Sequence, residues 1–333
     1  MFEIFVALCL SGAPETCRDQ LVPAGPFETS EACEAALAGR TGAFCAAAGE
    51  PLAFEEVAAG VFVHVGAIAE PDRENRGDVA NIGFIVGDAG VAVIDAGSAR
   101  WIAEGTWRAV RARTELPIGH LILTHMHPDH VLGAPFFEEA GAAVVGHAAF
   151  DRALADRLEN YEQSLSRLIG PAAFLGSGGV ATTVRVSGTL RIDLGERVLE
   201  VSAWGPAHTR TDVTVRDEAS GILFAGDLVF DDHAPALDGS LPGWQAVLEE
   251  LGAGSSVVVP GHGGPVLPWP DGADRLRRYL DVLAAEVRAA IAEGRRIGEV
   301  AATVAASEAG EWSLFEVYNP RNATQAYTEL EWE

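Results

Sequence analysis

The segment LTHMHPDHVLG, residues 123–133, constrains the fold of this chain more than any other stretch. It overlaps the end of the apolar run at residues 121–123, which is typical of a buried strand, and it places three histidines and one aspartate within six positions. So many ligand-type side chains cannot be buried together without a cation or a costly set of unpaired polar groups. The sequence therefore predicts a metal site where a strand ends.

Three further polar residues follow apolar runs elsewhere in the chain. His208 follows VLEVSAWGPA, Asp227 closes ILFAGD, and His262 follows SSVVVPG. Strand ends are rigid and the loops beyond them can aim side chains into a cleft, so we expect these residues to join the first motif at one edge of a sheet. The predicted metal ligands are His125, His127, Asp129, His130, His208, Asp227 and His262.

Imidazoles and carboxylates in this number suit zinc, with about four to five ligands for each ion. We expect His125 and His127 to share one ion, and the neighbouring Asp129 and His130 to hold a second. Asp227 has two carboxylate oxygens and can bridge both ions. The expected cofactor is a pair of Zn²⁺ ions, with iron as the alternative metal. Asp129 is also a candidate catalytic residue that orients the nucleophile or shuttles a proton.

Weaker candidates lie close to these motifs in the sequence. Asp95, at the end of VAVID, is expected to anchor the HMHPDH loop or a ligand histidine. His147 is a candidate for the border of the cleft and His233 for a substrate contact, with a structural role as the competing interpretation of each. His64 and His120 are expected to be structural.

From about residue 50 onward, the sequence pattern predicts a succession of strands and helices. The predicted strands are 61–66, 120–125 and 142–147, a hairpin within 81–97, pairs within 189–204 and 212–227, and a last strand within 255–263. The predicted helices are 99–113, 130–140, 151–169 and 273–294. Two sheets between layers of helices are the natural architecture for this order of strands and helices, so the sequence predicts an α/β fold. We expect three parts, namely a small cysteine-bearing segment over 1–49, a main domain over 50–270, and a C-terminal helix and tail over 271–333 packed on it.

All the cysteines of the chain lie in its first 45 residues, namely Cys9, Cys17, Cys33 and Cys45. An even number in one short segment favours two disulfides, with three possible pairings, over free thiols or a metal ion bound by all four thiolates. Disulfides would indicate an oxidising compartment such as a periplasm, whereas free thiols would fit a cytoplasmic protein. The apolar start MFEIFVALCLSGA carries Glu3 and no basic residue, so we interpret it as a strand and not as an export signal.

The formal net charge of −25 limits the classes of partner. A surface this acidic repels phosphate backbones and anionic lipid, so neither nucleic acid nor a membrane is an expected partner. No apolar segment reaches the roughly 20 residues that span a bilayer. We therefore expect a small-molecule substrate.

The motifs THMHPDH, GPAHT, FAGD and PGHG, in this order, resemble the metallo-β-lactamase superfamily over roughly residues 55–270. The resemblance implies a four-layer αββα sandwich. It assigns His125, His127 and His208 to a first metal, assigns Asp129, His130 and His262 to a second, and makes Asp227 the bridge. It further implies a metal-dependent hydrolase that uses a metal-bridging hydroxide to attack an ester, a thioester or a lactam-like amide.

The same resemblance bears on the subclass and on the loop near the metals. Class B1 lactamases have a cysteine near the position of Asp227, and this chain has none beyond Cys45, so that class is disfavoured. The family places a specificity flap where this chain has loop 66–80. Three substrate-contact candidates follow, with a solvated loop as the competing interpretation: Arg73, Asn75 and Arg76.

The cysteine-bearing N-terminus with NIGFIVGD, VIDAG, FAGDLVF and NPRNATQAYTELEW is similar to the quinoprotein relay system zinc metallohydrolases, a bacterial group akin to sulfur-oxidation-associated metallohydrolases. This similarity implies a link to a quinoprotein dehydrogenase system and leaves the substrate open. Two other functions remain as alternatives, a mononuclear iron oxidoreductase of the persulfide dioxygenase type and a non-catalytic metal-binding accessory protein. Bound-metal analysis with activity assays separates the three.

Overall fold

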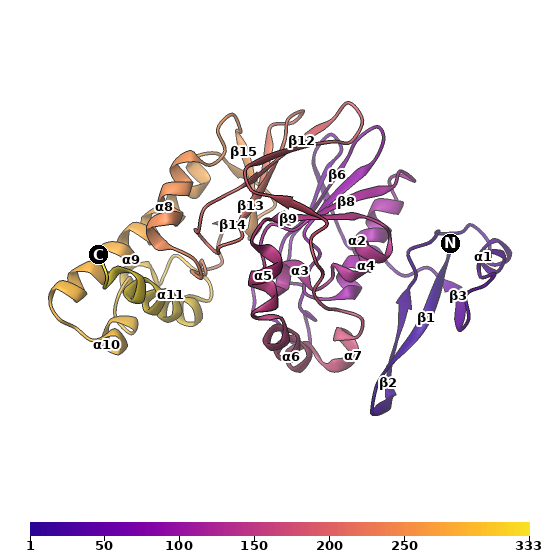
Figure 1. The fold of residues 1–333 in the computed structure, drawn as a ribbon, viewed down its shortest axis with the longest axis horizontal. Coiled ribbons are helices and arrows are strands. Elements are labelled where there is room, and N and C mark those ends of the chain that lie inside the picture. Colours follow the sequence, from indigo (N-terminus) through magenta and orange to yellow (C-terminus); the bar gives the residue numbers. More distant parts are fainter.

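In the computed structural model, which describes residues 1–333, two β-sheets pack face to face between layers of helices (Figure 1). The first sheet has the order β10-β9-β8-β7-β6-β5-β4. Its strands are β4 (Glu55–Ala58), β5 (Val61–His64), β6 (Ile82–Val86), β7 (Val91–Ile94), β8 (Ile118–Ile122), β9 (Ala143–His147) and β10 (Val184–Val186). The second sheet follows the chain order from β11 to β16. Its strands are β11 (Thr189–Asp193), β12 (Val198–Ala203), β13 (Val213–Asp217), β14 (Ile222–Phe230), β15 (Val257–His262) and β16 (Leu267–Pro268).

Helices cover the outer face of each sheet. On the first sheet lie α2 (Arg100–Arg111), α3 (Pro128–Val131), α4 (Pro135–Glu139), α5 (Phe150–Ala155), α6 (Leu158–Ile169) and α7 (Pro171–Phe174). On the second lie α8 (Leu241–Glu250) and α9 (Asp274–Ala292), the latter preceded by η1 (Asp271–Ala273). Helix α11 (Phe315–Leu330) packs against α9, and α10 (Ile297–Ala301) packs against α11, with η2 (Ala306–Glu308) between them in the chain. This arrangement confirms the predicted α/β fold with its four-layer αββα sandwich.

The buried strands are apolar on both faces because both faces are covered. In β7, Val91 and Val93 pack toward the helices, whereas Ala92 and Ile94 pack into the space between the sheets. Successive side chains of a strand point to opposite faces, so one unbroken apolar run serves two layers of core.

Parallel strands bring the polar residues of the motifs to one edge of the sandwich. In the first sheet β7 runs parallel to β8 and β8 runs parallel to β9, while β14 runs parallel to β15 in the second. The carboxyl ends of parallel strands lie at the same edge of a sheet, which is the usual place for a site in open α/β sheets. Asp95 follows β7 there, and His125 lies three residues beyond β8.

Two predicted helices are each divided in the structure. The segment 130–140 does not form one helix, because Pro135 lacks the backbone N–H that would continue α3 and begins α4 instead. The segment 151–169 forms α5 and α6, and the helical backbone is interrupted at Arg157, where φ is −126°. The guanidinium of Arg157 pairs with Asp238, 81 residues further along the chain, and helical periodicity carries no signal for such a contact.

The first 47 residues form a separate three-stranded sheet of β1 (Phe2–Leu10), β2 (Ala13–Leu21) and β3 (Ala43–Ala47), with the helix α1 (Ser30–Ala36). The strand expected at the start of the chain is therefore present. Disulfides join Cys9 to Cys17 and Cys33 to Cys45, which selects one of the three possible pairings. Ion pairs from Arg18 to Glu104 and from Glu3 to Arg108 attach this sheet to α2.

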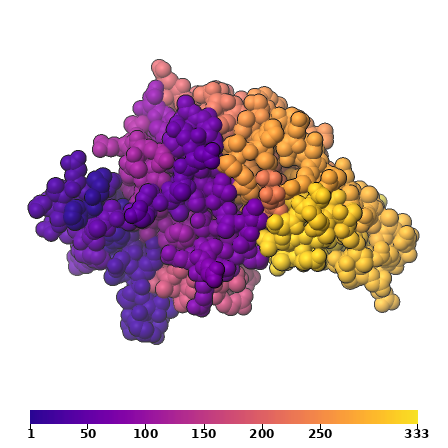
Figure 2. Space-filling model, turned by 180° about the vertical axis from the view of Figure 1, so that it is seen from behind, coloured from indigo at the N-terminus to yellow at the C-terminus, as the bar shows by residue number.

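The N-terminal sheet and the C-terminal helices lie at opposite ends of the molecule, as the indigo and yellow regions of Figure 2 show. None of the helices combines the length and the apolar character needed to cross a membrane.

Candidate metal centre

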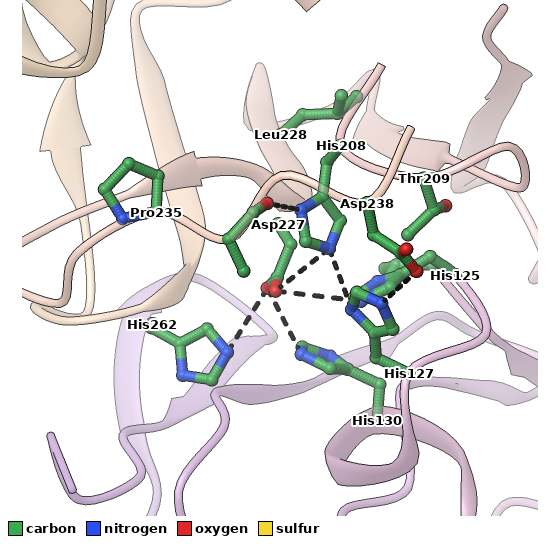
Figure 3. A network of polar contacts seen from close by, with 12 residues as sticks. His125, His127, His130, His208, Thr209, Asp227, Leu228, Pro235, Asp238 and His262 are labelled. Carbon is green, nitrogen blue, oxygen red and sulfur yellow. Dashed lines mark hydrogen bonds and ion pairs between the residues drawn. The ribbon is translucent and has the colours of Figure 1, made fainter. Parts of the chain in front are cut away.

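The structure brings together all seven residues that the sequence analysis selected as metal ligands. Figure 3 shows six of them, namely all except Asp129. One group consists of His125, His127, His208 and Asp227, and the other of Asp129, His130 and His262. Within each group the potential ligand atoms lie no more than 4.8 Å apart. The two groups match the two ligand sets that the family resemblance implies, and Asp227 lies between them.

The carboxylate of Asp227 faces both groups at once. Its Oδ2 lies 3.3 Å from Nε2 of His208 and 3.7 Å from Nε2 of His125. Its Oδ1 lies 3.2 Å from Nε2 of His130 and 3.4 Å from Nε2 of His262. Each oxygen therefore serves a different histidine group, which is the arrangement that a bridging carboxylate requires.

The backbone around Asp227 explains how this carboxylate reaches the centre. The residue does not end its strand as the sequence suggested, because β14 continues to Phe230. The pairing with β15 is instead irregular around Gly226, whose φ is +52°, a conformation that glycine adopts without strain. A Cβ on Gly261 would lie 1.9 Å from Oδ1 of Asp227, so only glycine leaves room for the carboxylate.

Hydrogen bonds fix the outward-facing nitrogens of the histidine rings. Nδ1 of His208 donates to the carbonyl of Ala236 at 2.5 Å, and Nδ1 of His262 donates to the carbonyl of Val79 at 2.8 Å. These bonds leave Nε2 of each ring free to act as an acceptor toward a cation, as ligand histidines require. Nε2 of His127 bonds to Oδ2 of Asp238 at 3.1 Å and so leaves Nδ1 for the same purpose.

Asp95 performs the anchoring role expected from the sequence. Its Oδ1 accepts from the backbone N–H of Thr124 at 2.8 Å, and its Oδ2 accepts from the Thr124 hydroxyl and from Nδ1 of His130, each at 2.8 Å. Asp95 adopts a positive φ of 63° and is buried. A strained backbone position thus holds both the start of the motif loop and one ligand ring.

Burial and the neighbouring charges shift the pKa values of the cluster in opposite directions. Burial lowers the pKa of His208 to about 3. Burial alone would also lower the pKa of His262, but the carboxylates of Asp227 and Asp129 raise it to about 9. Burial would raise the pKa of Asp129, yet His130 and His262 hold it well below its ordinary value. Asp129 is therefore a carboxylate at neutral pH.

Unpaired buried atoms indicate that the cluster fits metal ions. Nε2 of His125, Nε2 of His130 and Oδ1 of Asp227 are buried and have no hydrogen-bond partner in the protein. Orphaned buried polar groups are costly, and these three point toward the centre of the cluster, so a bound cation would satisfy each of them (Figure 3). Imidazole and carboxylate together suit zinc, and they also accept iron.

A cavity of about 830 Å³ opens onto the cluster. Helix α6 lines it with Tyr161, Leu165 and Leu168, and helix α11 lines it with Tyr318 and Arg321. The segment 151–169 therefore borders the cleft. The contribution of α11 was missed, because nothing in its local sequence links it to a site about 50 residues or more away in the chain.

The weaker candidates divide into those at the cavity and those away from it. His233 lines the cavity, and its ring centroid lies 4.7 Å from that of His262. His147 is not among the lining residues, and its Nδ1 accepts from the backbone N–H of Ala149. It ends β9 beside β10, so the strand pairing decides where its ring lies. His64 is structural, since it bonds the Ala53 carbonyl and Asp78.

The three candidates in loop 66–80 do not line the cavity. Arg76 stacks on Trp101 with its guanidinium carbon 4.5 Å from the ring centroid. Asn75 closes a turn of its own loop by accepting from the backbone N–H groups of Asp72 and Gly77, and Arg73 is exposed. The loop instead contributes Ala69, Glu70, Pro71 and Val79 to the cavity.

A family model described as the metallo-beta-lactamase superfamily matches residues 75–262, which is more than half of the chain. Among solved structures, the chain is similar to the metallo-beta-lactamase from Pontibacter korlensis, with 22% identity and a TM-score of 0.56 over 69% of this chain and 99% of that chain. It is also similar to TMB-1, with 19% identity and a TM-score of 0.54 over 69% of this chain and 97% of that chain. At these identities the two structures support the fold.

Proposed function

The chain belongs to the metallo-beta-lactamase superfamily, and on this premise we propose that it is a dinuclear zinc hydrolase of a small molecule with an ester, thioester or lactam-like amide bond. The observation that carries the proposal is the placement of Asp227, whose two oxygens face two separate groups of ligand-type side chains. A site for one metal would need only one of these groups.

The residues of the chain would hold the ions in two sets, with Asp227 shared between them. When bound, a pair of zinc ions would polarise a substrate carbonyl and lower the pKa of water so that it attacks near neutral pH. Asp129 lies on the cavity wall as a carboxylate, so it can accept a proton from the attacking water and orient it. His233 is neutral at pH 7, because burial and His262 lower its pKa to about 4, and it would contact the substrate beside the second group.

The walls of the cavity support a substrate with an apolar body. Leu165 and Leu168 of α6 face the same cavity as Phe230, so part of its wall offers hydrocarbon surface to a substrate, beside charged residues. Clefts that combine apolar walls with a set of polar groups are typical of small-molecule sites.

Metal content and turnover test the proposal together. We expect two zinc ions per chain in protein purified without added metal, and hydrolysis of at least one of nitrocefin, S-lactoylglutathione and simple aryl esters. The variant Asp227→Asn should lose metal and activity, whereas Asp156→Asn, at an exposed helix end, should retain both. One iron per chain with oxygen consumption would contradict the proposal and favour an oxidoreductase.

We also propose that the protein acts in an oxidising compartment such as a periplasm, within the quinoprotein relay branch of the superfamily. The two disulfides of the N-terminal segment support the compartment, and the motifs NIGFIVGD and NPRNATQAYTELEW support the branch. Fractionation of the cells that make the protein tests the compartment, and recovery in the cytoplasmic fraction would contradict it.

A further inference from the structure

Segment 235–238, which lies in the connection from β14 to α8, bonds two of the proposed metal ligands through the ring nitrogens that face away from the metal site. The carbonyl of Ala236 accepts from Nδ1 of His208, and the carboxylate of Asp238 accepts from Nε2 of His127. The opposite nitrogens of these two rings then point toward each other and lie 3.0 Å apart (Figure 3). The orientation of half of the first ligand group therefore depends on where this short segment lies.

The side chain of Asn322, on α11, holds this segment on both sides of Ala236. Its Oδ1 accepts from the backbone N–H of Leu237 at 2.8 Å, and its Nδ2 donates to the carbonyl of Pro235 at 2.6 Å. The second proton of Nδ2 goes to the hydroxyl of Tyr279 at 2.8 Å. Asn322 is only 1% exposed, so water cannot replace these bonds if the amide is removed.

Two more side chains of α11 bind the continuation of the segment. Gln325 donates to the carbonyl of Gly239, and Glu329 accepts from the hydroxyl of Ser240 and from the backbone N–H of Leu241. Positions 322, 325 and 329 are spaced by three and four residues, so they lie on one face of the helix. Among them, Asn322 alone bonds the residues that flank Ala236.

We propose that Asn322 is a positioning residue for the metal centre. It fixes residues 235–237 so that Ala236, and through the same segment Asp238, hold the rings of His208 and His127 ready for a cation. Without the amide, the segment loses two buried hydrogen bonds, and the two rings must be ordered at the moment of metal binding. The inference rests on the proposed function, since it concerns the same metal site.

The chain offers a matched control on the same helix. Asn319 is also buried, at 4% exposure, and its amide is bonded through both the oxygen and the nitrogen: Oδ1 accepts from the Tyr279 hydroxyl and Nδ2 donates to the carbonyl of Val304. It has no hydrogen bond to segment 235–241. Asn319→Ala therefore removes a comparable amide from the same buried network and leaves the support of Ala236 in place.

The experiment compares zinc affinity in the full-length wild type, Asn322→Ala and Asn319→Ala, each stripped of metal and titrated against a chromophoric zinc chelator. Thermal unfolding of the metal-free proteins measures the stability that each variant loses. We expect both variants to be destabilised to a similar extent. Only Asn322→Ala should bind one of its two zinc ions up to about 10-fold more weakly, at the lower end of the loss caused by removing a direct partner of a ligand, because Asn322 acts through Ala236. The absorption bands of bound cobalt should shift in that variant alone.

Equal affinities in all three proteins, or an equal loss in Asn319→Ala, would overturn the inference. If Asn322→Ala does not fold, Asn322→Asp replaces it, because aspartate keeps the acceptor for Leu237 and loses the donor to Pro235. A wild-type chain that binds no zinc would contradict the proposed function and with it this inference. A wild type with two zinc ions and an unaffected Asn322→Ala would contradict the inference alone.

Discussion

The hydroxyl of Tyr318 donates a hydrogen bond of 2.6 Å to the carboxylate of Glu70, although 248 residues separate the two in the sequence. Glu70 belongs to the loop between β5 and β6, and Tyr318 belongs to α11. Both line the cavity above the group of candidate metal ligands. Burial raises the pKa of Tyr318, so its hydroxyl remains a donor throughout the physiological range. The bond therefore joins the loop to the C-terminal helix over the site.

Removing this bond should loosen the loop over the cavity. A hydrogen bond to a charged group contributes about 1.5–3 kcal/mol, and part of that would be lost from substrate binding. We expect Tyr318→Phe to raise KM several-fold with a smaller change in kcat, as steady-state kinetics would measure. The control is Tyr327→Phe on the same helix, whose hydroxyl donates to the carbonyl of Arg295 outside the cavity. An unchanged KM in Tyr318→Phe would show that the bond does not shape the site.

Loss of the anchoring carboxylate should weaken the second metal more than the first. Asp95 accepts directly from His130 of the second ligand group, whereas it reaches His125 of the first group only through the Thr124 hydroxyl. We expect Asp95→Ala to bind one of the two ions about 10–100-fold more weakly. Metal content after dialysis against a weak chelator would measure this. Retention of both ions at wild-type affinity would contradict the role of Asp95.

Metal binding should release protons at neutral pH. Metal-free His262 has a pKa raised to about 9, so its ring is protonated at pH 7, while a metal requires the neutral imidazole. The deprotonation of His262 should therefore raise the apparent zinc affinity with pH up to about 9, and this contribution should level off at higher pH. Calorimetric titrations in buffers of different ionisation enthalpy would count the released protons. A count of zero at pH 7 would contradict the raised pKa.

An unpaired cation at the cavity predicts a preference among substrates. Arg321 lines the cavity with its guanidinium carbon 5.5 Å from the centroid of the Tyr318 ring and is paired with no carboxylate, in a chain whose net charge is −25. We expect Arg321→Gln to lower kcat/KM for a carboxylate-bearing ester by a few-fold and to leave its neutral amide or methyl analogue unchanged, with the difference shrinking at high salt. Arg167→Gln is the control, since Arg167 is exposed on α6 and does not line the cavity. Equal effects on both substrates would argue against a charge preference.

Reduction of the disulfides should destabilise the N-terminal sheet without affecting the metals. Each disulfide closes a short loop, with sequence separations of 8 and 12, and a crosslink of this kind typically contributes about 2–4 kcal/mol. We expect a reductant to lower the temperature at which this sheet unfolds, while the zinc content stays the same, because the sheet attaches to α2 and not to the ligand loops. Zinc loss on reduction under native conditions would contradict this separation.

Much of the site could be predicted from the sequence because its signals are local. Four ligand-type residues lie within six positions at the end of a strand, and the remaining ones follow or close apolar runs of their own. Since parallel strands present their ends at one edge, the type of each residue and its place along a strand were enough to bring the seven together. The same local patterns predicted the alternation of strands and helices and thus the fold class.

The contacts across the chain were decided by tertiary structure alone. Partners distant in sequence determine four features of the structure. These features are the bulge at Gly226 that turns Asp227 inward, the interruption of the helix at Arg157, the position of His147 and the pairing of the four cysteines. Helix α11 is the clearest case: the sequence pattern predicted only a tail after the helix at 273–294, and no local pattern indicates that Asn322 bonds the segment next to the ligands. Hydrophobic periodicity reports which face of an element is buried, whereas the neighbour on that face is set only when the layers pack.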